Sequence, residues 1–81
     1  MANWYEDAAR TLLEIARQDP GLAKILRGMI QQIEDNLEER QKKDTFGFST
    51  FRVYTNATYR FRVVYRYEDG QSLDIVTIGR F

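Results

Sequence analysis

Two features of the sequence predict an α+β domain, in which an N-terminal antiparallel helical hairpin packs on a three-stranded antiparallel sheet. Apolar residues recur every three or four positions through the first half of the chain, as on one face of a helix. From Thr45 onward the period changes to two, and aromatic and β-branched residues dominate, as strands favour. Helices and strands thus follow one another in the order α-α-β-β-β instead of alternating. With 81 residues, the chain is expected to form a single domain, residues 1–81.

The first helix is expected from Asn3 to Gln18, with Asn3 as its N-cap, because an asparagine side chain can accept a bond from a free backbone N–H. Asp19 and Pro20 then end this helix and begin the next, since aspartate caps well and proline fits the first helical position. The second helix is expected from Pro20 to Gln41. So short a connection predicts that the two helices lie antiparallel.

Three strands are expected, over residues 48–54, 59–67 and 72–80. Asp69 and Gly70 suit a tight two-residue hairpin turn, which would place Val63 opposite Val76. In the middle strand, aromatic and aliphatic side chains fill the odd positions and arginine fills most even positions. Because successive strand side chains point to opposite faces, the sheet should have one aromatic face under the helices and one cationic face.

On this register the cationic face carries an apolar patch of Val64, Leu73 and Ile75. Four arginines are expected to surround it: Arg52, Arg60, Arg62 and Arg66. The guanidinium group is a planar fork of donors that suits phosphate or carboxylate, so the face is a candidate partner site. The alternative interpretation is that these arginines are ordinary solubilising charge on apolar stems.

The composition excludes several kinds of chemistry. The chain has no cysteine and no histidine, so disulfides, thiolate metal sites and nucleophile–histidine pairs are impossible, and no metal or cofactor is expected. No apolar run approaches the roughly 20 residues that span a bilayer, and the first residues lack the pattern of a signal peptide. A soluble, cytoplasmic protein without a membrane partner is therefore expected. The net charge is zero, but residues 45–81 hold five arginines against three acids.

Three strand patterns carry a family resemblance: Phe51-Arg52-Val53, Phe61-Arg62-Val63-Val64-Tyr65 and Val76-Thr77-Ile78-Gly79-Arg80. With the helical hairpin before them, they make roughly residues 20 to 80 resemble the RelE/ParE superfamily of toxins from bacterial type II toxin–antitoxin systems. The resemblance implies a protein that inhibits growth and is neutralised by an antitoxin peptide. Its target would be translation, by mRNA cleavage at the ribosome, or DNA gyrase.

In the ribonuclease branch, the resemblance implies that Arg62 and Arg80 are catalytic. They would stabilise charge as the 2′-hydroxyl attacks the neighbouring phosphate, while Arg52 would position phosphate. The sequence differs from the family at both ends, because it begins directly with a helix where the family has a strand, and it stops at Phe81 where the family continues into a C-terminal segment. No general base can be identified on the sheet, so whether the chain is an enzyme is left open.

Two other functions fit the same pattern. A diverged or engineered module without catalysis would bind an acidic or amphipathic peptide on the arginine-rimmed face. A binder of single-stranded nucleic acid would stack bases on Tyr54, Tyr59 or Tyr65, although the predicted alternation turns the odd-numbered tyrosines toward the core.

Overall fold

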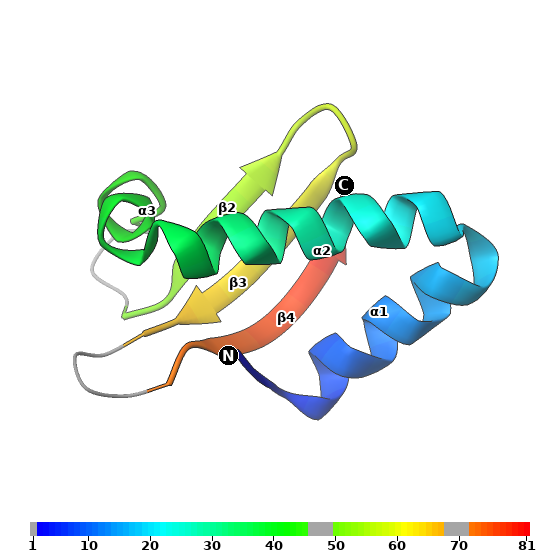
Figure 1. The fold of residues 1–81 in the computed structure, drawn as a ribbon, viewed down its shortest axis with the longest axis horizontal. Coiled ribbons are helices and arrows are strands. Elements are labelled where there is room, and N and C mark those ends of the chain that lie inside the picture. Colours follow the sequence, from blue (N-terminus) through cyan, green and yellow to red (C-terminus); the bar gives the residue numbers. More distant parts are fainter. Residues whose placement is uncertain (1, 46–49, 68–71) are drawn as a thin grey trace.

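The structure is a computed structural model that describes residues 2–45, 50–67 and 72–81. Its elements in chain order are β1 (Asn3–Trp4), α1 (Glu6–Gln18), α2 (Pro20–Asp35), α3 (Leu37–Lys43), β2 (Arg52–Asn56), β3 (Phe61–Arg66) and β4 (Asp74–Arg80). The strands form one four-stranded sheet in the order β1-β4-β3-β2. Strands β2, β3 and β4 are antiparallel (Figure 1). Strand β1 pairs with β4 in parallel. The α+β class and the antiparallel pairing of the three expected strands are confirmed, but the sheet has four strands where three were expected.

The chain enters the sheet before its first helix. The Asn3 backbone N–H donates to the carbonyl of Leu73 at 2.7 Å, and its side-chain Nδ2 donates to Oδ1 of Asp74 at 3.2 Å. Helix α1 begins only at Glu6, and Tyr5 at the N-cap makes no side-chain capping bond. The prediction of a helix from Asn3 was wrong, because the backbone of these residues finds partners on the edge of β4, at the far end of the sequence.

The connection between α1 and α2 is built as predicted. Oδ1 of Asp19 accepts a hydrogen bond from the backbone N–H of Leu22 at 3.1 Å, and Pro20 occupies the first turn. The second helix, however, is interrupted at Asn36, whose φ of −132° and ψ of 36° are not helical. The Asn36 side chain donates to the carbonyl of Gln32, a local bond that competes with helix continuation. The expected second helix is therefore divided, and α3 turns away from α2 (Figure 1).

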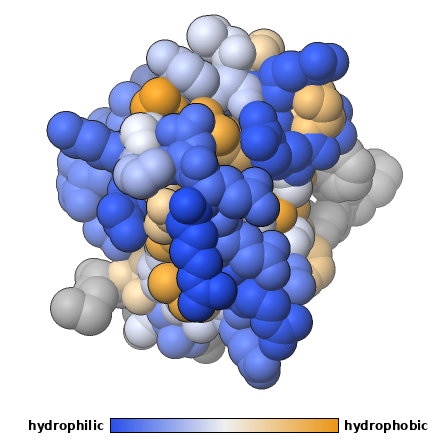
Figure 2. Space-filling view, turned by 90° about the vertical axis from the view of Figure 1, so that its right-hand side faces the viewer, coloured by the Kyte–Doolittle hydropathy of each residue, from blue (hydrophilic) through white to orange (hydrophobic). Residues whose placement is uncertain are grey.

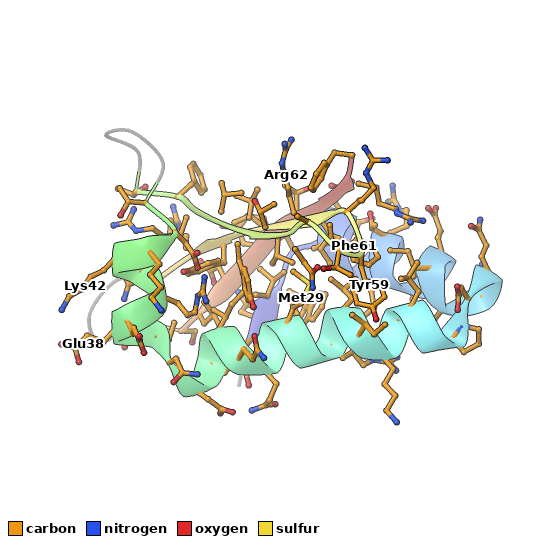
Figure 3. The ribbon with its side chains drawn as sticks, turned by 90° about the horizontal axis from the view of Figure 1, so that it is seen from above. Met29, Glu38, Lys42, Tyr59, Phe61 and Arg62 are labelled. Carbon is orange, nitrogen blue, oxygen red and sulfur yellow. The ribbon has the colours of Figure 1, made fainter. Side chains whose placement is uncertain are left out.

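Helices α1 and α2 cover one face of the sheet, here called the covered face (Figures 1 and 3). On this face the β3 side chains of Phe61, Val63 and Tyr65 point toward the helices and are fully buried, which confirms the predicted aromatic face. Met29 reaches from α2 toward Phe61 (Figure 3). The other buried apolar residues of the core are Ala8, Ile15, Ala23, Leu26, Ile30, Ile33, Leu73, Ile75 and Ile78.

A β-bulge changes the register between β3 and β4. Val63 lies opposite Ile78 and not Val76, and the pairing shifts between Val64 and Tyr65 so that Val76 is the extra residue on β4. An extra residue in one strand locally breaks the alternation of side chains. The predicted two-residue turn at residues 69 and 70 lies outside the described residues, but the pairing that it implied was wrong.

The bulge moves two residues of the expected apolar patch into the core. Ile75 and Ile78 are three positions apart, yet both point to the covered face, which only an inserted residue allows. Leu73 and Ile75 are 4% and 0% exposed. The prediction that they lie beside Val64 on the cationic face was therefore wrong. No helix in the described part of the chain is long and apolar enough to cross a bilayer.

Candidate binding face of the sheet

The face of the sheet turned away from α1 and α2, here called the open face, presents side chains from the two strands farthest from β1. Val53 lies opposite Val64 and Thr55 lies opposite Arg62 across the β2–β3 ladder, so each pair shares this face. Figure 3 shows Arg62 pointing away from the helices. The predicted position of Arg62 on the uncovered side of the sheet is confirmed.

The open face contains a hollow of about 740 Å³. Phe51, Val53 and Val64 supply its apolar floor, and Arg62 lines it together with Lys43 at the C-terminal end of α3. The ammonium group of Lys43 already lies 3.1 Å from a carboxylate oxygen of Glu39. Among the described residues, Arg62 forms no ion pair with a carboxylate. The hollow, which Asp44 also lines, therefore joins an apolar floor to Arg62, a cation without a carboxylate partner among the described residues.

Arg62 is supported by an aromatic ring. Its guanidinium carbon lies 4.3 Å from the centroid of the Phe81 ring, and that of Arg60 lies 5.9 Å from the same centroid. Both distances fall within the range of cation–π attraction. The backbone N–H of Phe81 donates to the carbonyl of Arg60 at 3.1 Å, which ties the end of β4 to the turn before β3.

The two arginines expected to be catalytic do not share a face. Arg62 is paired with Gly79 across β3 and β4, whereas Arg80 is paired with Phe61, which points to the covered face. The guanidinium carbon of Arg80 lies 5.1 Å from the centroid of the Phe61 ring. Since paired residues project to the same side of a sheet, Arg62 and Arg80 leave it on opposite sides. The structure thus does not bring them together around one reacting phosphate.

Two of the four expected rim arginines take part in holding the fold. Arg52 lies opposite the buried Tyr65, and its Nε donates to the carbonyl of Gln41 at 3.1 Å. Arg66 lies opposite Asp74, and its Nη2 is 3.4 Å from Oδ2 of that residue. Of the predicted rim, only Arg62 lines the hollow.

The most extensive polar network lies at the α3 end of the sheet and centres on the buried Asp44. Its Oδ2 accepts from the Tyr65 hydroxyl at 2.8 Å and from Nε of Arg40 at 3.1 Å, and its Oδ1 accepts from Nη2 of Arg40 at 2.7 Å. Burial, and then the hydrogen bond with Asp44, raises the pKa of Tyr65 above its ordinary value. The hydrogen bond with Asp44 also raises the pKa of Arg40. The Arg40 guanidinium lies 4.1 Å from the Tyr54 ring centroid.

Sequence reasoning missed this network, because a highly charged run at the end of a helix is usually a solvated terminus. The signal available was the spacing of Arg40 and Asp44, four residues apart and therefore on one helix face. Within the described residues, no buried side-chain nitrogen or oxygen lacks a hydrogen-bond partner. The network is complete by itself and stabilises the connection between α3 and β2.

The arrangement suits anion binding better than proton transfer. The part of the chain that the structure describes contains no group of three or more acidic side chains able to hold a metal ion.

The tyrosines suggested as stacking platforms for bases differ in exposure. Tyr65 is fully buried and the Tyr54 hydroxyl donates to Gln32 at 2.6 Å, so neither is placed to stack on a base. Tyr59 is 42% exposed, in the turn before β3. Viewed from the side of the α1–α2 connection, the surface is mostly hydrophilic, with apolar residues in small separate patches (Figure 2).

No protein-family model matches this chain, and no curated protein matches it. The resemblance to RelE/ParE toxins stays a prediction that depends on the strand patterns.

Proposed function

We propose that the protein is a cytoplasmic, RelE/ParE-like inhibitor of growth, which acts through the open face and is neutralised by an acidic, amphipathic antitoxin peptide. The order of its elements supports this proposal. The family pattern has a strand before the helical hairpin, and β1 at Asn3–Trp4 supplies one here. One of the two differences between this chain and the family pattern is thereby removed.

The observation that carries the proposal is the position of Arg62. It is exposed, it lines the apolar hollow, and no carboxylate of the described residues neutralises it. A guanidinium in this setting retains its full capacity for a carboxylate or a phosphate oxygen. An acidic side chain of a target protein or of an antitoxin can thus bind Arg62.

The geometry favours inhibition by binding over cleavage of mRNA. A ribonuclease mechanism needs cations aimed at one developing oxyanion, together with a group that takes the proton of the attacking hydroxyl. Arg62 and Arg80 are instead on opposite faces, and Tyr65, buried with a raised pKa, holds its proton. Of the two targets that the resemblance implies, DNA gyrase is therefore the one that this site supports better.

A module that binds peptides without inhibiting growth is the second candidate. The floor of Phe51, Val53 and Val64 offers contacts for an apolar side chain, next to the cation of Arg62. A peptide that alternates apolar and acidic residues matches both features. This function needs the same hollow but no cellular target.

Controlled expression in bacteria tests the proposal. The wild-type chain should arrest growth, Arg62→Ala should restore it, and the matched control Arg27→Ala, which removes an exposed arginine of α2, should still arrest growth. A supercoiling assay with purified gyrase and a cell-free translation assay then identify the target. Normal growth with well-expressed wild-type protein would overturn the toxin proposal.

Peptide binding separates the second candidate from the first. If the wild-type chain is harmless, a fluorescein-labelled peptide of alternating leucine and glutamate should still bind, as measured by fluorescence anisotropy. Val64→Glu, which places a carboxylate on the floor of the hollow, should abolish this binding, whereas Arg27→Ala should not change it. No binding by the wild-type chain would rule out the module as well.

A further inference from the structure

Two arginines at the turn end of the sheet share a single aromatic ring. Arg60 comes immediately before β3 and Arg62 is its second residue, while Phe81 follows β4. The two guanidinium carbons lie 5.9 and 4.3 Å from the centroid of the Phe81 ring, which is itself 41% exposed. One exposed ring therefore lies within cation–π distance of two like charges.

The backbone of Arg60 adopts a conformation that a side chain disfavours. Its φ of 59° lies in the left-handed region, and it is the only residue other than glycine with a positive φ in the described part of the chain. A hydrogen bond of 3.1 Å from the Phe81 N–H to the Arg60 carbonyl holds this turn in place. Strain of this kind persists where the surrounding structure enforces it, and it often marks a functional position.

The electrostatics of the pair is incomplete without an anion. Two guanidinium groups repel each other, and none of the ion pairs among the described residues supplies Arg60 or Arg62 with a carboxylate. The residue opposite Arg62 on β4 is Gly79, and even an added Cβ there would touch nothing within 4 Å. On the β4 side of Arg62, the space above Gly79 is thus open.

We propose that Phe81 is a positioning residue, which holds Arg62 and Arg60 together as a two-guanidinium clamp for one anionic group, a carboxylate or a phosphate. The ring orients both side chains before the ligand arrives, so less conformational freedom is lost on binding. The proposal rests on the proposed function, because Arg62 is the residue on which that function depends, and it adds Arg60 and Phe81 to the site.

Nuclear magnetic resonance of the arginine Nε–H groups tests the clamp. Uniformly ¹⁵N-labelled protein is titrated at constant ionic strength with sodium phosphate and, separately, with sodium acetate. In the wild-type chain the Nε signals of Arg60 and Arg62 should shift together with one dissociation constant in at least one titration. The anion that saturates them tells a phosphate ligand from a carboxylate ligand.

Substitution of Phe81 separates positioning from bulk. Phe81→Leu keeps an apolar side chain but removes the ring. It should weaken the affinity for the anion by about fivefold and increase the picosecond motion of the Arg62 Nε–H. Phe81→Tyr keeps the ring and should restore binding to within about twofold of wild type. Lys24→Ala, an exposed change on α2, should leave the titration unchanged.

Two results would overturn the proposal: unchanged affinity in Phe81→Leu, or a shift of Arg62 alone while Arg60 stays in place. The titration needs no cellular target, so its outcome is separate from that of the growth assay. A chain that arrests growth without coupled arginine shifts would refute the clamp only. A harmless chain with coupled shifts would refute the toxin only.

Discussion

The arginines at the two ends of the sheet are held in different ways. At the α3 end, where β2 begins and β3 ends, each arginine donates to or pairs with an oxygen of the protein: Arg40 with Asp44, Arg52 with the carbonyl of Gln41, and Arg66 with Asp74. Aromatic rings lie under arginines at both ends, but at the turn end Arg60, Arg62 and Arg80 form no ion pair among the described residues.

The difference follows from where the chain places its acids. Asp44 arrives at the end of α3 and Asp74 at the start of β4, both at the same end of the sheet. From Thr45 to Tyr67 the sequence contains four arginines and no acid. The same residue type therefore stabilises the fold at one end and remains available to an external anion at the other. Substitutions should separate these two roles.

Asp44→Ala should have the largest effect on stability. It leaves the Arg40 guanidinium partly buried without its carboxylate and the buried Tyr65 hydroxyl without its acceptor. Breaking a buried pair by removing one partner costs about 3–5 kcal/mol. Urea unfolding should show this loss as a lower midpoint with an unchanged slope. Glu39→Ala, which removes only the exposed pair with Lys43, should cost about 0.5 kcal/mol or less.

Tyr65→Phe should cost about 1.5–3 kcal/mol near neutral pH, the contribution of a hydrogen bond to a charged group. The loss should also depend on pH. Because the pKa of Tyr65 is raised in the folded state above its ordinary value of 10.0, the hydroxyl ionises more readily in the unfolded chain. The stabilisation is thus complete below pH 10 and declines as the pH rises above it.

Unfolding free energies of wild type and Tyr65→Phe, measured in urea across this range, check the sign. The difference between the two proteins should shrink as the pH rises above about 10. A constant difference would mean that the hydroxyl contributes packing alone, and the α3 end would then resemble the turn end more than the structure indicates.

Arg60→Gly should stabilise the protein while weakening its anion clamp. Glycine adopts a positive φ without the steric cost of a Cβ, so the unfolding free energy should rise by about 0.5–1 kcal/mol. Arg60→Ala is the matched control, because it removes the guanidinium but keeps the Cβ, and its stability should stay close to wild type. Equal stability of the two variants would contradict the role of backbone strain.

The parts of the fold that the sequence predicted correctly depend on local patterns. The helical hairpin follows from the cap at Asp19 and the position of Pro20, and the buried face of β3 follows from alternation. Strand β1 was missed because its partners on β4 are about seventy positions away, and its two residues carry no strand pattern of their own. Pairing between such distant segments is not contained in local periodicity.

The bulge at Val76 explains the error at the candidate site. Strict alternation placed Leu73 and Ile75 on the same side as Arg62, whereas the extra residue turns them toward the helices. The three-residue spacing of Ile75 and Ile78 was a signal for this irregularity, because both are large aliphatic residues suited to a core. The position of Arg62 on the open face was predictable, since buried and uncovered side chains alternate along β3 without interruption through that residue.

Arg62→Ala should have the smallest effect on stability, within about 0.5 kcal/mol of wild type, because its side chain is exposed and its ring partner is partly solvated. Its effect on growth arrest or on peptide binding should nevertheless be complete. Urea unfolding of this variant beside Asp44→Ala therefore compares the two ends of the sheet directly. If Arg62→Ala also lost several kcal/mol, as expected for Asp44→Ala, Arg62 would be part of the support of the fold. The restored growth would then report unfolding, and only the Nε titration of the wild-type chain would still test anion binding at the turn end.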